Sequence, residues 1–262
     1  IRRLEEYLGA RELGRLSHPG TFFDFTRYRP QVRIVNEQRV FSTPNSIVRY
    51  AKHQETQKDY IFLDLREPHS MGETYTDAIV ALLNHFNVTE YCRIGSMYDS
   101  VPHTRPLMVT GSLNEEQFEK VKHLVSPKKN AYQGPTSIVN LVDNTLLHSN
   151  LTITSLMVHV PQYVQLNEDY MGVSRILETL AALYEFPMSL ASNNTGQQQY
   201  LDIGNSVANN KQVAKLVEQL ETYYDQVLSP KTSKDKIAFS PEVESFLTEM
   251  SDLLGNVSDD QI

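Results

Sequence analysis

Short apolar runs alternate along the chain with longer amphipathic segments, and this alternation predicts an α/β fold. The apolar runs are rich in β-branched and aromatic residues, which favour strands. Predicted strands cover residues 21–30, 31–36, 60–66, 90–98, 106–111 and 151–161. Predicted helices, with apolar positions on one face, cover residues 1–16, 42–54, 71–86, 114–125, 134–149, 175–186 and 210–228.

The run 151–161 is apolar almost throughout, which is typical of a strand that is covered on both faces. Its one histidine, His159, is predicted to be a hydrogen-bonded core residue. The order of strands and helices indicates a mostly parallel central sheet with helices on both faces. In such sheets ligands bind beyond the carboxyl ends of the strands, so polar loops at those ends are the first candidates for a site.

The pattern predicts a single α/β domain over residues 1–228, followed by a linker and an amphipathic C-terminal helix within 229–262. Ser240 is the expected N-cap of that helix, with Pro241 at its first position. An apolar stripe along it must be buried against the chain's own core or against a neighbouring chain. The stripe consists of Val243, Phe246, Leu247, Met250 and Leu254.

Composition narrows the functional classes. The 262 residues carry a net charge of -8, which argues against nucleic acid as the main partner. Residues 1–66 nevertheless hold 12 Lys and Arg against 8 Asp and Glu, so this part forms either a solvated surface or a basic patch. No apolar run reaches the roughly 18 residues that a membrane span requires, so no membrane association is expected.

Cysteine and histidine usage argues against a metal or a cofactor. Cys92 is the single cysteine, which excludes an intrachain disulfide and a cysteine-based zinc site. The histidines show no metal-ligand spacing, and the Gly-x-Gly-x-x-Gly pattern of dinucleotide sites is absent. The first residues lack the features of a signal peptide. We therefore expect a cytoplasmic protein without metal or cofactor.

The sequence Tyr-Asp-Ser-Val-Pro-His-Thr-Arg-Pro at 98–106 follows a predicted buried strand and holds the densest set of reactive groups. His103 could act as an acid or base near neutral pH, with Asp99 orienting it. Arg105, beside Thr104, could bind phosphate or carboxylate with two hydrogen bonds. The alternative is a structural network that fixes an irregular crossover, and the absence of an obvious nucleophile favours it.

Two further stretches have a functional and a structural interpretation. Gly-Pro-Thr-Ser at 134–137, with Gly134 and Thr136, either directs backbone N–H groups toward an anion or simply begins a helix. Asp-Leu-Arg-Glu-Pro-His at 64–69 places Glu67 at the end of a strand. Its carboxylates either do acid–base chemistry or form a salt-bridged edge, and the second is favoured.

Three stretches, 101–111, 130–142 and 156–186, together resemble the proteasome assembly chaperone 2 family. They include Val-Pro-His-Thr-Arg-Pro at 101–106 and Val-Pro-Gln-Tyr at 160–163, and the resemblance extends over residues 20–227. It implies a fold similar to that of purine nucleoside phosphorylases and related hydrolases. It also implies homo-oligomers, trimers among them, and relatives that act by binding other proteins. It carries over no catalytic residue.

Two hypotheses follow. The first is a non-enzymatic, chaperone-like oligomeric protein whose partners are proteins, itself included, and neither nucleic acid nor membrane. The alternative is a protein that binds, or an enzyme that acts on, a nucleoside- or phosphate-containing small molecule. The alternative's candidate site consists of Glu67, Asp99, His103, Thr104, Arg105, Gly134 and Thr136.

Overall fold

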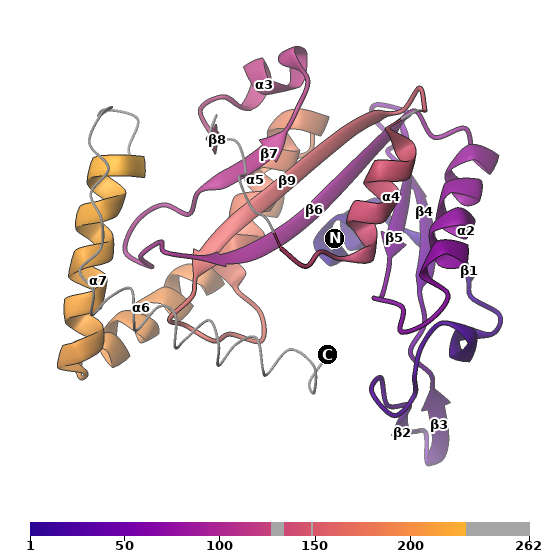
Figure 1. The fold of residues 1–262 in the computed structure, drawn as a ribbon, viewed down its shortest axis with the longest axis horizontal. Coiled ribbons are helices and arrows are strands. Elements are labelled where there is room, and N and C mark those ends of the chain that lie inside the picture. The colour runs from indigo at the N-terminus through magenta and orange to yellow at the C-terminus, as the bar shows by residue number, and fades with distance from the viewer. Residues whose placement is uncertain (127–133, 148, 229–262) are drawn as a thin grey trace. The chain divides into compact units, whose positions relative to one another are not determined.

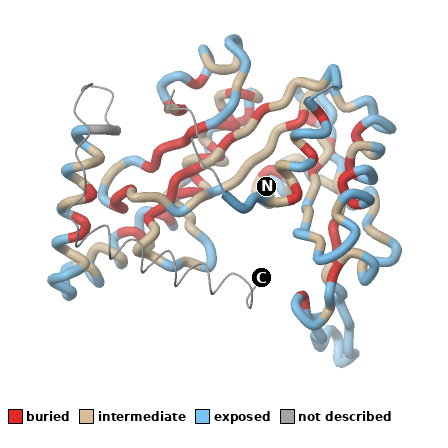
Figure 2. Tube along the Cα trace, in the orientation of Figure 1, coloured by how far each residue is buried: buried red, intermediate tan, exposed pale blue. Residues whose placement is uncertain are grey.

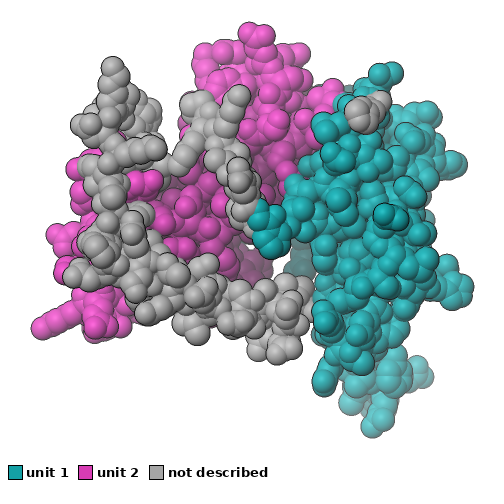
Figure 3. Space-filling model, viewed as in Figure 1, with its two compact units in different colours: residues 1–89, 133–151, 258–262 teal, residues 90–132, 152–257 magenta. Residues whose placement is uncertain are grey.

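The computed structural model describes residues 1–126, 134–147 and 149–228, which fold into alternating helices and strands (Figure 1). The chain forms two compact units (Figure 3). Of the described residues, the first contains 1–89, 134–147 and 149–151, and the second contains 90–126 and 152–228. The single domain expected over residues 1–228 stays a prediction, and the linker and helix expected in 229–262 lie outside the described residues.

The first unit is built on a three-stranded antiparallel sheet in the order β1-β4-β5. The helix α2 buries Tyr75, Ile79 and Leu83, which are four residues apart and therefore share one face. The Tyr75 ring also packs edge-on against Phe23, with 6.0 Å between the ring centres. The elements of this sheet and its helices are β1 (Arg11–Arg15), β4 (Ile47–Lys52), β5 (Asp59–Asp64), α1 (Arg2–Leu8), α2 (Gly72–His85) and α4 (Ile138–Leu146), with a short 3-10 turn η1 (Pro19–Thr21).

A separate two-stranded hairpin belongs to the same unit. It consists of β2 (Gln31–Val35) and β3 (Gln38–Ser42), which pair antiparallel only with each other. Asn36 and Glu37 form its two-residue turn with φ angles of 49° and 64°. Two consecutive left-handed residues match the twist of the strands that they connect, so the turn fixes the register of the hairpin.

The second unit is built on a mixed sheet in the order β6-β9-β7-β8. β6 runs parallel to β9, β9 antiparallel to β7, and β7 parallel to β8. Its strands are β6 (Glu90–Asp99), β7 (Val109–Ser112), β8 (Val125–Ser126) and β9 (Thr152–Pro161). Its helices are α3 (Glu115–Val121), α5 (Tyr170–Tyr184), α6 (Asn194–Ala208) and α7 (Lys211–Tyr223), with the shorter turns η2 (Met188–Ala191) and η3 (Tyr224–Leu228).

The core of the second unit lies between β9 and α5. β9 is buried from Val158 to Pro161, as the apolar run predicts (Figure 2). Gly172 in α5 approaches Val160 so closely that an added Cβ would lie 3.3 Å from its methyl group. Gly196 in α6 comes closer still to α5, since a Cβ there would lie 2.7 Å from the backbone nitrogen of Met171. Gly172 thus lets α5 pack closely on β9, and Gly196 lets α6 pack closely on α5.

The predicted α/β class is confirmed, and so are the parallel strands 90–98 and 151–161. The prediction of a mostly parallel sheet holds for the second unit, where two of three strand pairs are parallel, whereas the sheet of the first unit is antiparallel. In the part of the chain that the structure describes, no helix has the length and apolar character that crossing a membrane requires.

Two predictions in the first unit are wrong. Residues 42–54, predicted as a helix, contain the strand β4, which pairs with β1 on one side and β5 on the other. Pairing with β1 and β5 overrides the local cap signal, because Ile47 and Val48 also suit a strand. Residues 21–30, predicted as a strand, form turns. The Asp24 carboxylate accepts a hydrogen bond from the backbone N–H of Thr26 at 2.8 Å and stabilises a turn there.

Several element boundaries also differ from the prediction. The helix predicted over 1–16 ends at Leu8, where Gly9 adopts a left-handed φ of 63°, and β1 follows. The helix predicted over 114–125 ends at Val121 before β8. The helix α6 was not predicted, because its sequence is mostly polar and only Gly196 and Tyr200 are buried.

Candidate functional site

The predicted site residues fall into two groups, each within one unit. Asp99, His103, Thr104 and Arg105 lie in the second unit, at the end of β6 and in the loop that leads to β7. Glu67, with the stretch 134–137, lies in the first unit at the start of α4. Each group is therefore considered by itself.

Arg105 is held by carboxylates of the same chain. Its guanidinium donates two hydrogen bonds to Asp225, from Nε at 2.9 Å and from Nη2 at 2.7 Å. A third goes from Nη1 to Glu221 at 3.1 Å, and the Thr104 hydroxyl donates to the same carboxylate. These contacts raise the pKa of Arg105 and lower that of Asp225. The loop is thereby attached to α7 and η3, which favours the structural interpretation of Arg105.

His103 is buried, with 8% of its surface exposed. Its backbone N–H donates to the Tyr163 hydroxyl oxygen at 2.7 Å, and its Nδ1 lies 2.6 Å from that oxygen. Because the oxygen already accepts one hydrogen bond, its own proton can go to Nδ1, which requires a neutral imidazole. Burial lowers the pKa of His103 below its usual 6.5, and the Glu221 carboxylate opposes this shift.

His103 also faces a pocket of about 460 Å³ in the second unit. Thr104 and Arg105 contribute to the same wall, and Tyr200 and Asn193 come from α6 and the residue before it. The Tyr200 hydroxyl donates to Asp169, so it is already paired. The pocket therefore brings three of the predicted residues together.

Asp99 takes part in a buried polar chain that spans three strands. Its carboxylate lies 2.6 Å from Nδ1 of His159 on β9, whose Nε2 lies 2.8 Å from the Thr110 hydroxyl on β7. A carboxylate, an imidazole and a hydroxyl in this order also occur in hydrolytic triads. Here, however, Thr110 is only 3% exposed, so a substrate has no access to its oxygen. The prediction that His159 is a hydrogen-bonded core residue is confirmed.

Glu67 occupies the position that the sequence suggested for an external anion. Its two carboxylate oxygens accept from the backbone N–H of Ile138, the first residue of α4, at 2.9 and 3.0 Å. Thr136 accepts from the side-chain amide of Asn140, and Gly134 is exposed. The start of α4 is thus stabilised by the chain's own carboxylate, and ligand binding by these residues stays a prediction.

The structure shows two features that sequence reasoning missed, and the first is the hairpin. All residues from 31 to 42 are exposed (Figure 2). Val32, Ile34 and Phe41 share one face, because Val32 lies opposite Phe41 and Ile34 opposite Arg39. Their exposed fractions are 55%, 76% and 72%. We call this set the apolar hairpin face. Polar and apolar residues alternate in 31–34, ahead of Asn36 and Glu37. This alternation was the sequence feature that could have indicated the hairpin.

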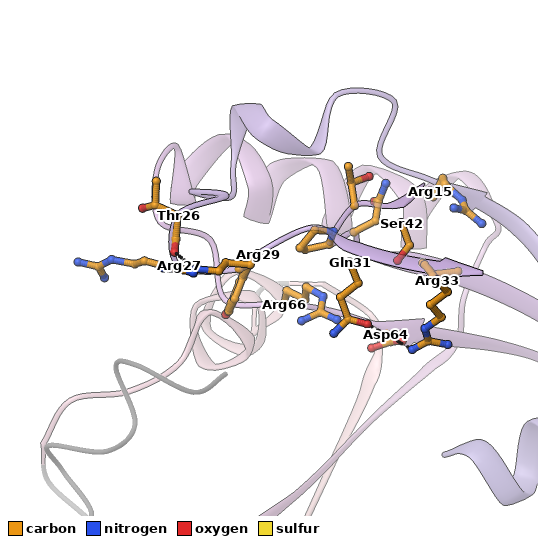
Figure 4. Close-up of a pocket in the computed structure, with 14 residues that line it drawn as sticks. Arg15, Thr26, Arg27, Arg29, Gln31, Arg33, Ser42, Asp64 and Arg66 are labelled. Atoms are coloured by element: carbon orange, nitrogen blue, oxygen red, sulfur yellow. Dashed lines mark hydrogen bonds between the residues drawn. The ribbon is translucent and has the colours of Figure 1, made fainter. Parts of the chain in front are cut away.

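The second missed feature is a pocket of about 820 Å³ in the first unit (Figure 4). We call it the arginine pocket, since its wall contains Arg15, Arg27, Arg29, Arg33 and Arg66 and a single acid, Asp64. The arginines come from β1, β2, the loop 26–30 and the end of β5. The excess of basic residues in 1–66 was the sequence feature that could have indicated this pocket. The fold brings five of these arginines together in its wall.

Two kinds of exposed surface stand out among these features, one apolar and one positively charged. Among the described residues, no group of three or more His, Cys, Asp or Glu side chains is placed to hold a metal ion. Neither the His103 pocket nor the arginine pocket is lined by a cysteine, and the hydroxyl that contacts His159 is buried. What is available at the surface is apolar area on the hairpin and positive charge in the arginine pocket.

A known protein family matches most of the chain in sequence. The sequence model of the PAC2 family matches residues 1–202. No protein of curated function matches the sequence. The resemblance to the proteasome assembly chaperone 2 family is thereby confirmed.

Three solved structures share the fold at 18–20% identity. A PAC2 family protein from Streptomyces avermitilis is 20% identical, with a TM-score of 0.70 over 82% of this chain and 90% of its own. A Corynebacterium glutamicum protein of unknown function is also 20% identical, with a TM-score of 0.75 over 88% of this chain and 85% of its own. A Mycobacterium tuberculosis proteasome-assembly chaperone homologue is 18% identical, with a TM-score of 0.70 over 82% of this chain and 91% of its own.

The neutral state of His103 predicts a dependence of stability on pH. Because the folded state lowers the pKa of this group, the unfolded chain binds the proton more readily just below pH 6.5. Stability is therefore present above that pH and is lost as the pH falls through the window beneath it. We expect the Tm to drop between about pH 7.5 and pH 5.5, and the drop to be smaller in His103→Asn.

Thermal unfolding followed by circular dichroism at both pH values measures this difference. His18→Asn is the control. His18 is exposed, so this substitution removes one histidine without changing the pocket. An equal drop in the wild type and in His103→Asn would show that His103 does not carry the effect.

Proposed function

The chain belongs to the PAC2 family, and we propose that it is a non-enzymatic, chaperone-like protein that binds other proteins and copies of itself. The observation that carries the proposal is the apolar hairpin face. A two-stranded sheet has no second layer to cover its apolar side chains and is marginally stable in water by itself. Covering Val32, Ile34 and Phe41 with another protein removes this apolar surface from water and stabilises the hairpin.

A second copy is the occupant that we propose for the apolar hairpin face. The first unit also has an apolar groove of about 280 Å³ between its sheet and α2, lined in part by Leu13, Val48 and Phe86. Leu13 and Phe86 are 46% and 41% exposed. Every copy thus carries both an unburied hairpin face and an unfilled apolar groove. Docking one into the other between copies would bury both.

The relatives support the role by analogy. The Mycobacterium tuberculosis structure is called a proteasome-assembly chaperone homologue, and assembly chaperones act through protein contacts. For this chain a protein-binding role, a homo-oligomeric state and a cytoplasmic location belong to the proposal. The match at 18% identity shows the fold, so the role rests on the hairpin together with family membership.

Substitutions on the apolar hairpin face test the proposal. We expect Ile34→Ser/Phe41→Ser to weaken self-association by about tenfold or more, because two large side chains lose their apolar contact area. Light scattering coupled to size-exclusion chromatography over a range of protein concentrations measures the effect. Leu13→Ser should weaken association from the groove side.

Leu201→Ser is the matched control, since Leu201 is 63% exposed on α6 and belongs to neither surface. The folded state of each variant is checked by its far-ultraviolet circular dichroism and Tm. A wild-type chain that stays monomeric at every concentration would contradict the proposal. So would an oligomer that the hairpin and groove substitutions leave unchanged.

One observation favours a second candidate function, the binding of a small nucleoside- or phosphate-containing molecule. His103 is buried yet faces a pocket of about 460 Å³, a size that suits such ligands. A thermal-shift panel of nucleosides, nucleotides and inorganic phosphate tests this candidate. A Tm increase that is lost in His103→Asn would support it, and no increase with any compound would remove it.

A further inference from the structure

The arginine pocket concentrates positive charge without matching negative charge. Five arginines and one aspartate contribute to its wall. Arg15 is paired with Glu12 at 2.5 Å. Among the described residues, no carboxylate lies within ion-pairing distance of the guanidinium groups of Arg27, Arg29, Arg33 or Arg66. Like charges that share a concave surface repel one another, so an anionic ligand would relieve this repulsion.

Neutral neighbours orient three of these guanidinium groups and leave donors for a ligand. Arg66 lies over the Tyr28 ring, 5.4 Å from its centre. Arg33 donates from Nη2 to the side-chain oxygen of Gln31 at 3.2 Å. Arg29 donates from Nε to the Thr26 carbonyl at 3.4 Å. Each guanidinium has five N–H donors, so most remain available.

The shape of the pocket indicates which anion fits. Phosphate sites commonly use a helix N-terminus or a glycine-rich turn, whereas the wall of this pocket comes from strands and the loop 26–30. Figure 4 shows the labelled arginines spread along the pocket, with Arg27 extending outward at one end. Spaced guanidinium groups fit carboxylates that are spaced along a chain, each bound by two hydrogen bonds.

We propose that the arginine pocket binds an acidic, carboxylate-rich segment of a protein partner. This inference rests on the proposed protein-binding function and names the chemistry of the partner. The hairpin connects the two sites. Gln31, Arg33 and Ser42 line the pocket and share the hairpin face opposite to the apolar one. One face of the hairpin then docks on a second copy, and the other face helps to bind the acidic segment.

The experiment uses the full chain and a fluorescein-labelled peptide of eight glutamates, with binding followed by fluorescence anisotropy. We expect saturable binding that weakens as the salt concentration rises, because the contacts are charged and open to solvent. Arg29→Glu/Arg33→Glu should weaken binding by about tenfold or more, since two favourable charges become repulsive. A peptide of eight glutamines should not bind.

The matched control is Arg2→Glu/Lys58→Glu, which changes the net charge by the same amount. Both control residues are exposed, and both lie outside the arginine pocket, the hairpin and the apolar groove. We expect the control variant to bind the glutamate peptide within about twofold of the wild type.

Three results would overturn the inference. The first is no binding of the glutamate peptide to the wild type. The second is an equal loss in the pocket variant and its control, which would reflect net charge alone. The third concerns competition. If inorganic phosphate or ATP displaces the labelled peptide at the same concentration at which unlabelled glutamate peptide does, the pocket is assigned to phosphate. Self-association through the apolar hairpin face is measured separately, so failure of this inference and of the proposed function are distinguishable.

Discussion

A two-stranded sheet cannot cover either of its own faces. The β2–β3 hairpin therefore leaves both of its faces open to a contact from outside the hairpin, and the proposed binding role of the first unit depends on this constraint. Its turn at Asn36 and Glu37 fixes the register, so Val32, Ile34 and Phe41 are held together on one side. Side chains on this face are more than half exposed in the isolated chain. A contact with another protein is the direct way to remove that apolar surface from water. The opposite face of the hairpin contributes to the wall of the arginine pocket. The strands β2 and β3 therefore carry an apolar surface on one face and part of a charged surface on the other.

The second unit shows how reactive side chains can be used for structure. The loop that holds His103 and Arg105 is attached to α7 by an ion pair with Glu221 and to η3 by an ion pair with Asp225. Asp99, His159 and Thr110 form a polar chain across three strands, in which His159 and Thr110 are buried. Buried polar groups must be paired, and each of these side chains has found a partner within the chain. The pocket beside His103 is available to a ligand, and its use is a separate question from the polar networks.

Much of the fold could be predicted from local patterns, because buried strands and amphipathic helices leave a strong periodic signal. The strands 60–66, 90–98 and 151–161 and the helix 71–86 are of this kind. β4 was mistaken for a helix because its pairing partners lie elsewhere in the chain. The candidate site shows the same limit. The sequence left open whether Arg105 binds a ligand or fixes the loop, because its carboxylate partner Asp225 lies 120 residues away. Similarly, the stretch 134–137 allowed an anion site or a plain helix start, and the sequence could not show that Glu67 accepts the hydrogen bond from Ile138 at the start of α4.

Hydrogen exchange of the hairpin amides as a function of protein concentration tests the central claim most directly. In a free hairpin, even the amides that pair β2 with β3 exchange with water quickly, because an uncovered two-stranded sheet is marginally stable and opens often. If the apolar hairpin face docks on a second copy, protection of residues 31–42 should rise with concentration, together with that of the groove around Leu13 and Phe86. Exchange in 31–42 that is equally fast at all concentrations, while the protein self-associates, would contradict the account.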